Sequence, residues 1–108
     1  MANTFKLATK ANVGVTSVGI YTAPSNATST IIGITLANIS GSGINVTVGI
    51  ARTLADDVSI LRNVPIPQGS SLEVMQGNKI VLEPSDSITA KSDVTASLDV
   101  AVTLLEMT

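Results

Sequence analysis

The sequence predicts an all-β protein, an antiparallel β-sandwich of jelly-roll or small-barrel type with about eight or nine strands. Three observations support this prediction. Apolar and polar residues alternate along several segments with the period of two that a half-buried strand requires. Clusters of Gly, Pro, Asn, Asp and Ser separate these segments. No segment shows the 3.6-residue spacing of an amphipathic helix, and Val, Ile, Thr and Gly are poor helix formers.

The alternation is clearest near the C-terminus, in the segment ASLDVAVTLLE. One face of this segment is apolar and carries Ala96, Leu98, Val100, Val102 and Leu104. The segments INVTVGI (44–50) and TIIGITLAN (30–38) show the same period of two. Extended along the chain, the pattern predicts strands at residues 4–10, 13–21, 30–39, 44–54, 58–64, 71–76, 79–83, 86–91 and 95–106.

Turn-forming residues lie between these strands. They group in the segments TAPSNATS (22–29), SGSG (40–43), PIPQGSS (65–71), QGN (76–78) and EPSD (83–86). Two of the turns predict hairpins. SGSG would join strands 30–39 and 44–54, and Gly77-Asn78 would form a tight turn between strands 71–76 and 79–83.

The composition limits the class of protein. At 108 residues the chain fits one domain, 1–108, in which residues 1–10 form either an edge strand or an N-terminal arm that reaches a neighbour. Aromatic residues are 2% of the chain, so the core must be aliphatic. A net charge of −2 without a cluster of Lys or Arg predicts no nucleic-acid partner. The chain shows no secretory-signal pattern and no run of about 18 apolar residues, so we expect no membrane partner.

Few residues are available for catalysis. The chain contains no His and no Cys, which removes the commonest general base, the thiolate nucleophile and the usual transition-metal ligands. A carboxylate pair could serve glycoside hydrolysis, but one Phe and one Tyr cannot line a sugar-binding cleft. We therefore expect no enzyme activity and no cofactor.

Two segments place acidic residues close together, Asp56-Asp57 and Glu83-Pro84-Ser85-Asp86. A calcium ion takes six or more oxygen ligands, and neither segment has the spacing of a dedicated calcium loop. The simpler interpretation makes Asp86 an Asx-type turn former, with a calcium site as the alternative. We expect no metal site.

The segment between Lys10 and Arg52 contains no charged residue, although a soluble domain normally distributes charges over its surface. In strand 44–54 the residues opposite the apolar face are small and neutral. They either face water or pack on another subunit, because interface cores are depleted in charge. The length of the uncharged segment favours an interface. The candidate interface residues are Phe5, Thr35, Ala37, Asn45, Thr47 and Gly49.

Several segments together carry a resemblance to a known group of proteins. They are MANTFKLAT (1–9), YTAP (21–24), VPIPQGSSLEV (64–74), NKIVLEPSDSI (78–88) and the closing LLEMT (104–108). In these segments the chain resembles small virion structural proteins of tailed bacteriophages. The resemblance implies a non-enzymatic protein of the capsid surface, a head decoration (cement) protein made in the host cytoplasm. Its implied partners are further copies of itself and the major capsid protein or another virion protein.

Two alternatives stay open. The resemblance also fits a neck or tail component, such as a collar or fibre-attachment protein. The second alternative is a β-sandwich that binds the host surface, which would need an exposed aromatic residue or a calcium site. Only Tyr21 and the Asp56-Asp57 segment are available for that purpose.

Overall fold

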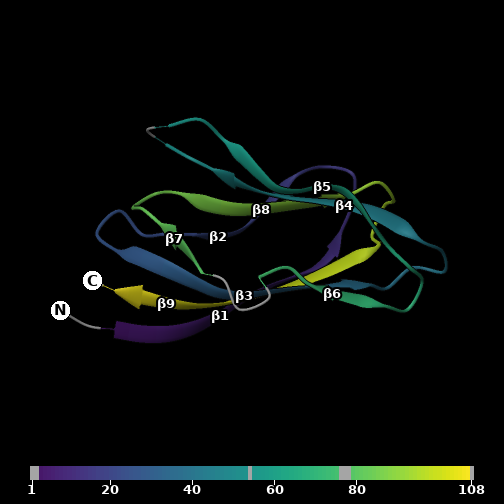
Figure 1. Ribbon diagram of the computed structural model, residues 1–108, viewed down its shortest axis with the longest axis horizontal. Coiled ribbons are helices and arrows are strands. Elements are labelled where there is room, and N and C mark those ends of the chain that lie inside the picture. The colour runs from purple at the N-terminus through teal and green to yellow at the C-terminus, as the bar shows by residue number, and fades with distance from the viewer. Residues whose placement is uncertain (1–2, 54, 76–78, 108) are drawn as a thin grey trace.

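The computed structural model describes residues 3–53, 55–75 and 79–107. Over these residues the chain forms nine strands in two antiparallel sheets, which pack face to face (Figure 1). This confirms the predicted β-sandwich. Within the described residues there is no helix of the length and apolar character needed to cross a membrane.

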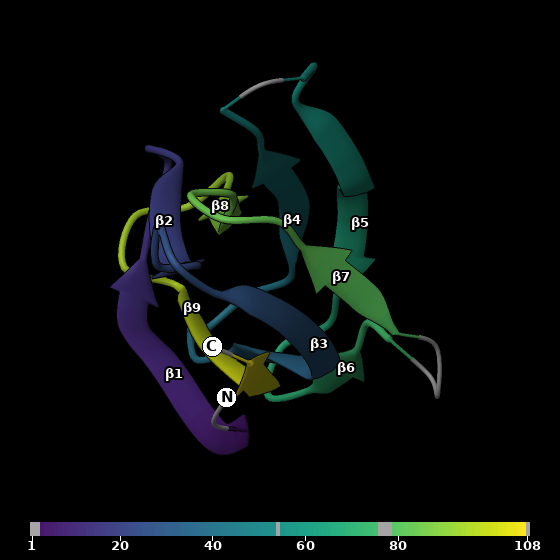
Figure 2. The ribbon, with the colours of Figure 1, turned by 90° about the vertical axis from the view of Figure 1, so that its left-hand side faces the viewer.

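Each sheet has a defined strand order, and Figure 2 shows the two layers from one end of the sandwich. Sheet A contains, in order, β1 (Asn3–Val13), β9 (Leu98–Met107) and β3 (Thr28–Asn38), followed by β6 (Ser71–Glu73) and β7 (Ile80–Leu82), which share the free edge of β3. Sheet B contains, in order, β2 (Val18–Thr22), β8 (Ser87–Ser92), β4 (Ile44–Ala51) and β5 (Val58–Ile66).

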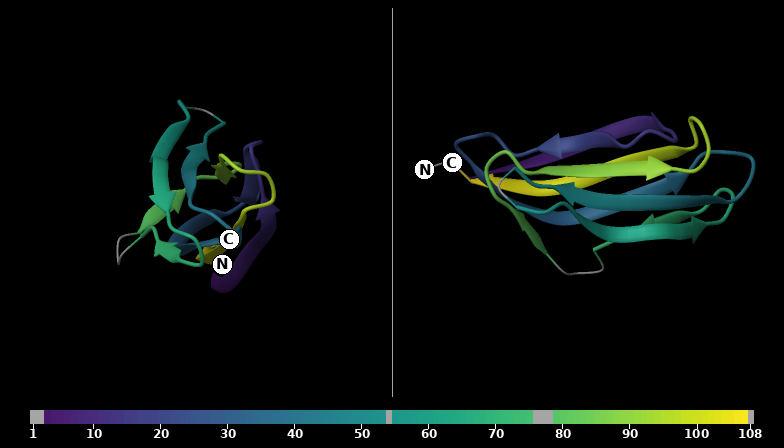
Figure 3. Two further views of the ribbon diagram at one scale, coloured as in Figure 1. Left: turned by 90° about the vertical axis from the view of Figure 1, so that its right-hand side faces the viewer. Right: turned by 90° about the horizontal axis from the view of Figure 1, so that it is seen from above.

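The pairing of the strands is nested. β1 pairs with β9, β2 with β8, β3 with β6 and β7, and β4 with β5. Between these pairs the chain passes repeatedly from one sheet to the other, as the end and top views show (Figure 3). This is the connectivity of a jelly roll.

The core between the sheets is aliphatic. Alternate residues of each central strand point inward, and in β9 they are Leu98, Val100, Val102 and Leu104, all at most 3% exposed. Inward Ile, Leu and Val side chains of β3, β4 and β8 meet them from both sheets. Each fully buried side chain of this kind contributes about 1.5–3 kcal/mol, so aliphatic burial supplies most of the packing between the sheets.

The first predicted hairpin is wrong, because β3 and β4 lie in different sheets. Asn38 explains why the SGSG segment is a crossover. Its buried side-chain amide donates to the carbonyls of Ser42 at 2.8 Å and Ile66 at 3.0 Å. Its Oδ1 accepts from the backbone N–H of Ser40 at 2.9 Å. These bonds satisfy a buried polar side chain and direct the chain toward the opposite sheet.

The second predicted hairpin is also wrong, because β6 and β7 each pair with β3 along its edge. Between them the Glu73 carboxylate accepts from the backbone N–H of Ile34 at 3.1 Å. The backbone N–H of Val74 donates to the Ile34 carbonyl at 2.8 Å. The edge of β3 is therefore satisfied by two short strands and a side chain. The predicted Gly77-Asn78 turn lies outside the described residues.

All nine predicted strands are present, and the main difference in their bounds lies near Val13. We predicted a strand over residues 13–21, whereas Val13 ends β1 and β2 begins at Val18. Asn12 allows the longer β1, since it adopts a positive φ of 57° and its backbone N–H donates to Asp99 Oδ1 at 3.0 Å. Asn tolerates this backbone conformation better than most residues.

Gly49 of β4 provides a test of the packing in sheet B. A Cβ at this position would lie 2.7 Å from the Val58 carbonyl oxygen on β5, so Gly49→Ala should cost about 1–3 kcal/mol of unfolding free energy. Gly19→Ala on β2 is the control, because its Cβ would meet nothing within 4 Å. Chemical denaturation measures both. Equal stability of the two variants would contradict this account of β4 and β5.

Candidate assembly surface

The six candidate interface residues do not form one surface. Phe5, Thr35 and Ala37 lie on the outer side of sheet A. Each of them is paired with a residue of β9 that points away from the core, and these partners are Leu105, Ala101 and Asp99 respectively. Asn45, Thr47 and Gly49 lie on β4, on the outer side of sheet B. The set is divided because β3 and β4 belong to different sheets. The role of all six as interface residues stays a prediction.

The outer side of sheet A, here called face A, is built from rows of directly opposed residues. The first row is apolar at both ends and contains Phe5, Leu105, Thr30 and Val81. The second row contains Leu7, Thr103 and Gly33. The third row contains Thr9, Ala101, Thr35 and Glu73. Residues directly opposed on one side of a sheet are close neighbours, so Phe5, Leu7 and Leu105 lie together, and Val81 lies beyond Thr30 at the other end of the first row. These four side chains are here called the apolar patch.

Three large apolar side chains of this patch lie in water. Phe5 is 73% exposed, Leu7 is 68% exposed and Val81 is 59% exposed. The chain has a single Phe, and the fold places it on the surface while the core is filled with aliphatic residues. Exposed apolar residues that gather in one patch, unlike scattered ones, mark interaction sites.

Charges border the apolar residues of face A. Glu73 Oε1 would lie 3.6 Å from a Cβ at Gly33. The exposed Lys79 and Glu83 lie two residues on either side of Val81. Asp99 accepts the Asn12 backbone N–H, and Glu73 accepts the Thr35 hydroxyl at 2.8 Å in addition to its backbone bond. Next to them a hollow of about 260 Å³ has small side chains at its floor, including Ala37 and Ala101. Face A thus combines exposed apolar side chains with a shallow hollow lined in part by Lys10 and Asp99, an arrangement of apolar centre and polar rim that is typical of interfaces.

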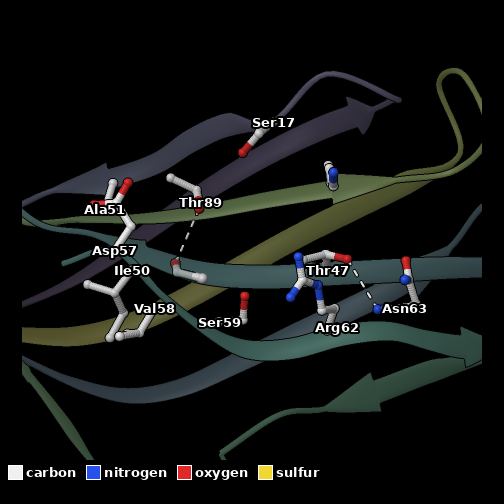
Figure 4. A pocket seen from close by; sticks show the side chains of 12 residues that line it. Ser17, Thr47, Ile50, Ala51, Asp57, Val58, Ser59, Arg62, Asn63 and Thr89 are labelled. Atoms are coloured by element: carbon white, nitrogen blue, oxygen red, sulfur yellow. Dashed lines mark hydrogen bonds between the residues drawn. The ribbon is translucent and has the colours of Figure 1, made fainter.

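The outer side of sheet B has a different character. Thr47 and Gly49 line a pocket of about 360 Å³ together with Arg62, Asn63 and Lys91 (Figure 4). The backbone N–H of Asn63 donates to Thr47 Oγ1 at 3.2 Å. This surface can contact polar or anionic groups, and no aromatic side chain lines it as a platform for a sugar ring.

The pocket does not assemble an acid/base pair among the described residues. It contains one carboxylate, that of Asp57, which accepts the Arg52 backbone N–H at 2.8 Å. General acid/base catalysis by carboxylates needs two groups in different protonation states. The described lining of this pocket therefore lacks the carboxylate pair that glycoside hydrolysis uses.

The acidic segment at Asp86 is built around Arg52. Asp86 is buried, and its Oδ2 accepts from Arg52 Nε at 3.0 Å and from the Glu83 backbone N–H at 3.3 Å. Arg52 also binds Glu83 at 2.9 Å. Asp86 thus helps to close the turn 83–86, but its carboxylate accepts from the residue three positions before it and not from the one two positions after it, so the turn is not of the predicted Asx type. No group of three or more Asp or Glu gathers elsewhere in the described chain.

Tyr21 connects the two sheets and does not form an exposed binding platform. Its hydroxyl donates to Glu106 Oε2 at 2.8 Å and lies 2.7 Å from Ser29 Oγ. Glu106 is buried and also binds Lys6 of β1 at 3.0 Å. Burial raises the pKa of Tyr21, so the hydroxyl stays protonated and available as a donor. The cluster therefore fastens β1 to β9 and joins both to sheet B.

Sequence reasoning found Phe5 but missed Leu7, Val81 and Leu105 as members of face A. Leu7 had a local signal, since it follows Phe5 at the spacing of two that places both on one side of a strand. Val81 and Leu105 had none, because only the long-range pairing through Thr30 brings them into the same row.

Comparisons with known proteins show the fold. No protein-family model and no curated protein sequence matches the chain. A chain of the Bacillus endospore appendages, which form disulfide-linked pili, is similar at a TM-score of 0.58 and 14% identity, over 99% of this chain and 87% of that one. A chain of the acidic stable capsid structure of Helicobacter pylori bacteriophage KHP30 has a TM-score of 0.59 and 11% identity, over 99% and 89%.

A third similar chain comes from the structure of the infectious bursal disease virus Gx strain. It has a TM-score of 0.51 and 12% identity, over 95% of this chain and 37% of that one. All three comparisons relate the chain to β proteins of large assemblies by fold alone, because their sequence identities are low.

The Glu106 cluster predicts a specific pH dependence of stability. The Tyr21 hydrogen bond, followed by Lys6, lowers the pKa of Glu106 in the folded protein. This stabilisation is complete above the unfolded pKa of about 4.3 and is lost as the pH falls through the folded value. Glu106→Gln should therefore be less stable than wild type at pH 7, and the difference should shrink in acid.

Denaturation midpoints at pH 7 and pH 3 measure this difference. Asp56→Asn, which removes an exposed carboxylate, is the control and should show a smaller change between the two pH values. A stability difference for Glu106→Gln that stays constant with pH would contradict the role assigned to the cluster.

Proposed function

We propose that the protein is a non-enzymatic structural component of a virus particle, a capsid decoration (cement) protein of a tailed bacteriophage that binds the shell through face A. The observation that carries this proposal is the apolar patch, of which the fold holds Phe5, Leu7 and Val81 in water. A chain that works as an isolated monomer has no use for such a patch.

The energetics of face A suit repeated, modest contacts. Each of the three exposed side chains can contribute up to about 1.5–3 kcal/mol when it is buried against a partner. The molecule measures 45 × 25 × 21 Å, so its long side can supply an interface of the standard size of about 800 Å² per partner. On a symmetric shell the same contact repeats at every copy, and flanking subunits are held together by many such contacts.

The fold is compatible with this role, since jelly rolls are common in viral capsids. Two of the similar chains come from virus structures, one of them a bacteriophage capsid. These similarities support a structural role in a virus particle, but they do not distinguish between positions within the particle. The decoration role rests on the resemblance of the sequence to small tailed-phage virion proteins and on the single apolar face.

The alternative role is a neck or tail component, such as a collar, fibre-attachment or host-surface-binding protein. The pocket beside Arg62 and Lys91 favours this alternative only in its host-binding form, because these cations could contact anionic groups of a cell surface. A pilus-type assembly through disulfides does not apply, since the chain contains no cysteine. The major capsid protein or another virion protein is the partner that we propose for face A.

Charge placed on face A should weaken binding to the particle. We expect Val81→Lys to reduce binding to undecorated phage capsids by about tenfold or more, since a Lys ammonium would have to be desolvated in the interface. Val58→Lys is the matched control, because Val58 is a strand residue that is 50% exposed on β5 of sheet B. Co-sedimentation with capsids measures the binding, and thermal unfolding shows that both variants are folded.

The result also separates the two faces. Equal losses in both variants, or a greater loss for Val58→Lys, would contradict binding through face A. Failure of the wild-type protein to bind either capsids or tails would contradict the virion role itself.

A further inference from the structure

The two sheets have four edges, and three of them are protected against pairing with another chain. β5 carries Pro65, a positive φ at Asn63 and shifts in its register with β4. β2 has five residues with a register shift between Gly19 and Tyr21. β6 and β7 have three residues each. Proline, bulges and short strands are the usual means by which proteins protect an edge.

The fourth edge, β1, has no proline and no register shift before Lys10, and its only protection of the usual kinds in that stretch is the charge of Lys6 and Lys10. From Asn3 to Lys10 it pairs with β9 through eight consecutive residue pairs, and its irregularity begins only after Lys10. β1 is the outermost strand of sheet A in the end views (Figures 2 and 3), and residues 3–7 are exposed. A long, regular edge of this kind presents a row of backbone donors and acceptors to a further strand.

We propose that β1 pairs in antiparallel orientation with β1 of a second copy of this chain, about a two-fold axis at Leu7. This proposal rests on the proposed function and makes it more specific, because it states that the first partner of the chain is a second copy of itself. A two-fold contact uses the same surface of both copies and therefore needs a self-complementary strand.

The charges of β1 select the register. With the axis at Leu7, Lys6 lies opposite Ala8 and Lys10 lies opposite Thr4 of the second copy. An axis at residue 6 would place Lys6 opposite Lys6, and an axis at residue 8 would place Lys6 opposite Lys10. Like charges directly opposite each other destabilise a strand pair. An axis at residue 5 or at residue 9 avoids this repulsion but pairs fewer residues of the regular segment.

The outward residues fit the same register. Leu7 meets Leu7 on the axis, and Phe5 meets Thr9 of the second copy, so no charged side chain enters the contact on face A. The ammonium of Lys6 is already bound to Glu106 at 3.0 Å on the other side of the sheet. Pairing would also set the two faces A side by side, which doubles the apolar surface available to a third partner.

Cysteine cross-linking tests the contact directly, because the natural chain contains no cysteine. Directly opposed residues of antiparallel strands have Cα atoms about 4.5–5.5 Å apart, within the range that a disulfide spans. Leu7→Cys in the full chain should therefore form a covalent dimer under mild oxidation, about tenfold more than Val81→Cys. Val81 is the control because it is similarly exposed and lies at the opposite edge of face A.

A mixture of Phe5→Cys and Thr9→Cys chains tests the register. We expect the mixed dimer to form, and each variant alone to form about tenfold less. Strong self-linking of Phe5→Cys would overturn the axis at Leu7. Absence of Leu7→Cys dimers, or equal dimer formation by Val81→Cys, would overturn the strand pairing. If Leu7→Cys stays monomeric while the wild-type chain binds capsids, the pairing alone fails and the proposed function stands.

Discussion

β1 is held on the sandwich by its ladder to β9 and by the ion pair between Lys6 and Glu106, whose other oxygen accepts from Tyr21. The other surface features depend on this attachment. Because the first strand pairs with the last, β1 extends sheet A beyond the aliphatic core, and its outward side chains, Phe5 and Leu7, have no partner layer. The same attachment uses Lys6 and leaves the outward side of the strand without charge.

The two outer faces follow from the jelly-roll connectivity. Most consecutive strands change sheets, with β4–β5 and β6–β7 as the exceptions, so many residues that are close in sequence are separated onto opposite sides of the molecule. Face A receives Phe5, Leu7 and Val81, whereas the pocket on the outer side of sheet B is lined by hydroxyls, Arg62 and Lys91 together with the apolar Ile50 and Val58. A protein whose two outer faces differ in this way is suited to lie on a larger surface in one orientation, as a decoration protein must. The buried core provides the rigidity, and face A is the surface that we propose for the contact.

The sequence was sufficient for features that depend on local pattern. Alternation located the strands, and the lack of aromatic residues indicated the aliphatic core. It was insufficient for strand partners, since a β-strand ladder depends on distant residues. The SGSG segment suits a hairpin turn equally well, and only the buried bonds of Asn38 to Ser42 and Ile66 make it a crossover. For the same reason the sequence predicted only part of the candidate surface. Val81 lies in the same row as Phe5 only because β3 pairs with both β7 and β9.

We expect face A to be covered in the native assembly and the outer side of sheet B to stay exposed. Covalent footprinting of the protein in intact particles, compared with the isolated chain, tests this most directly. We expect labelling of Phe5, Leu7 and Val81 to fall strongly in the particle, and labelling of Val58 and Val15, which are also exposed in the isolated chain, to stay unchanged. Unchanged labelling of Phe5 and Val81, with protection at Val58, would contradict the account.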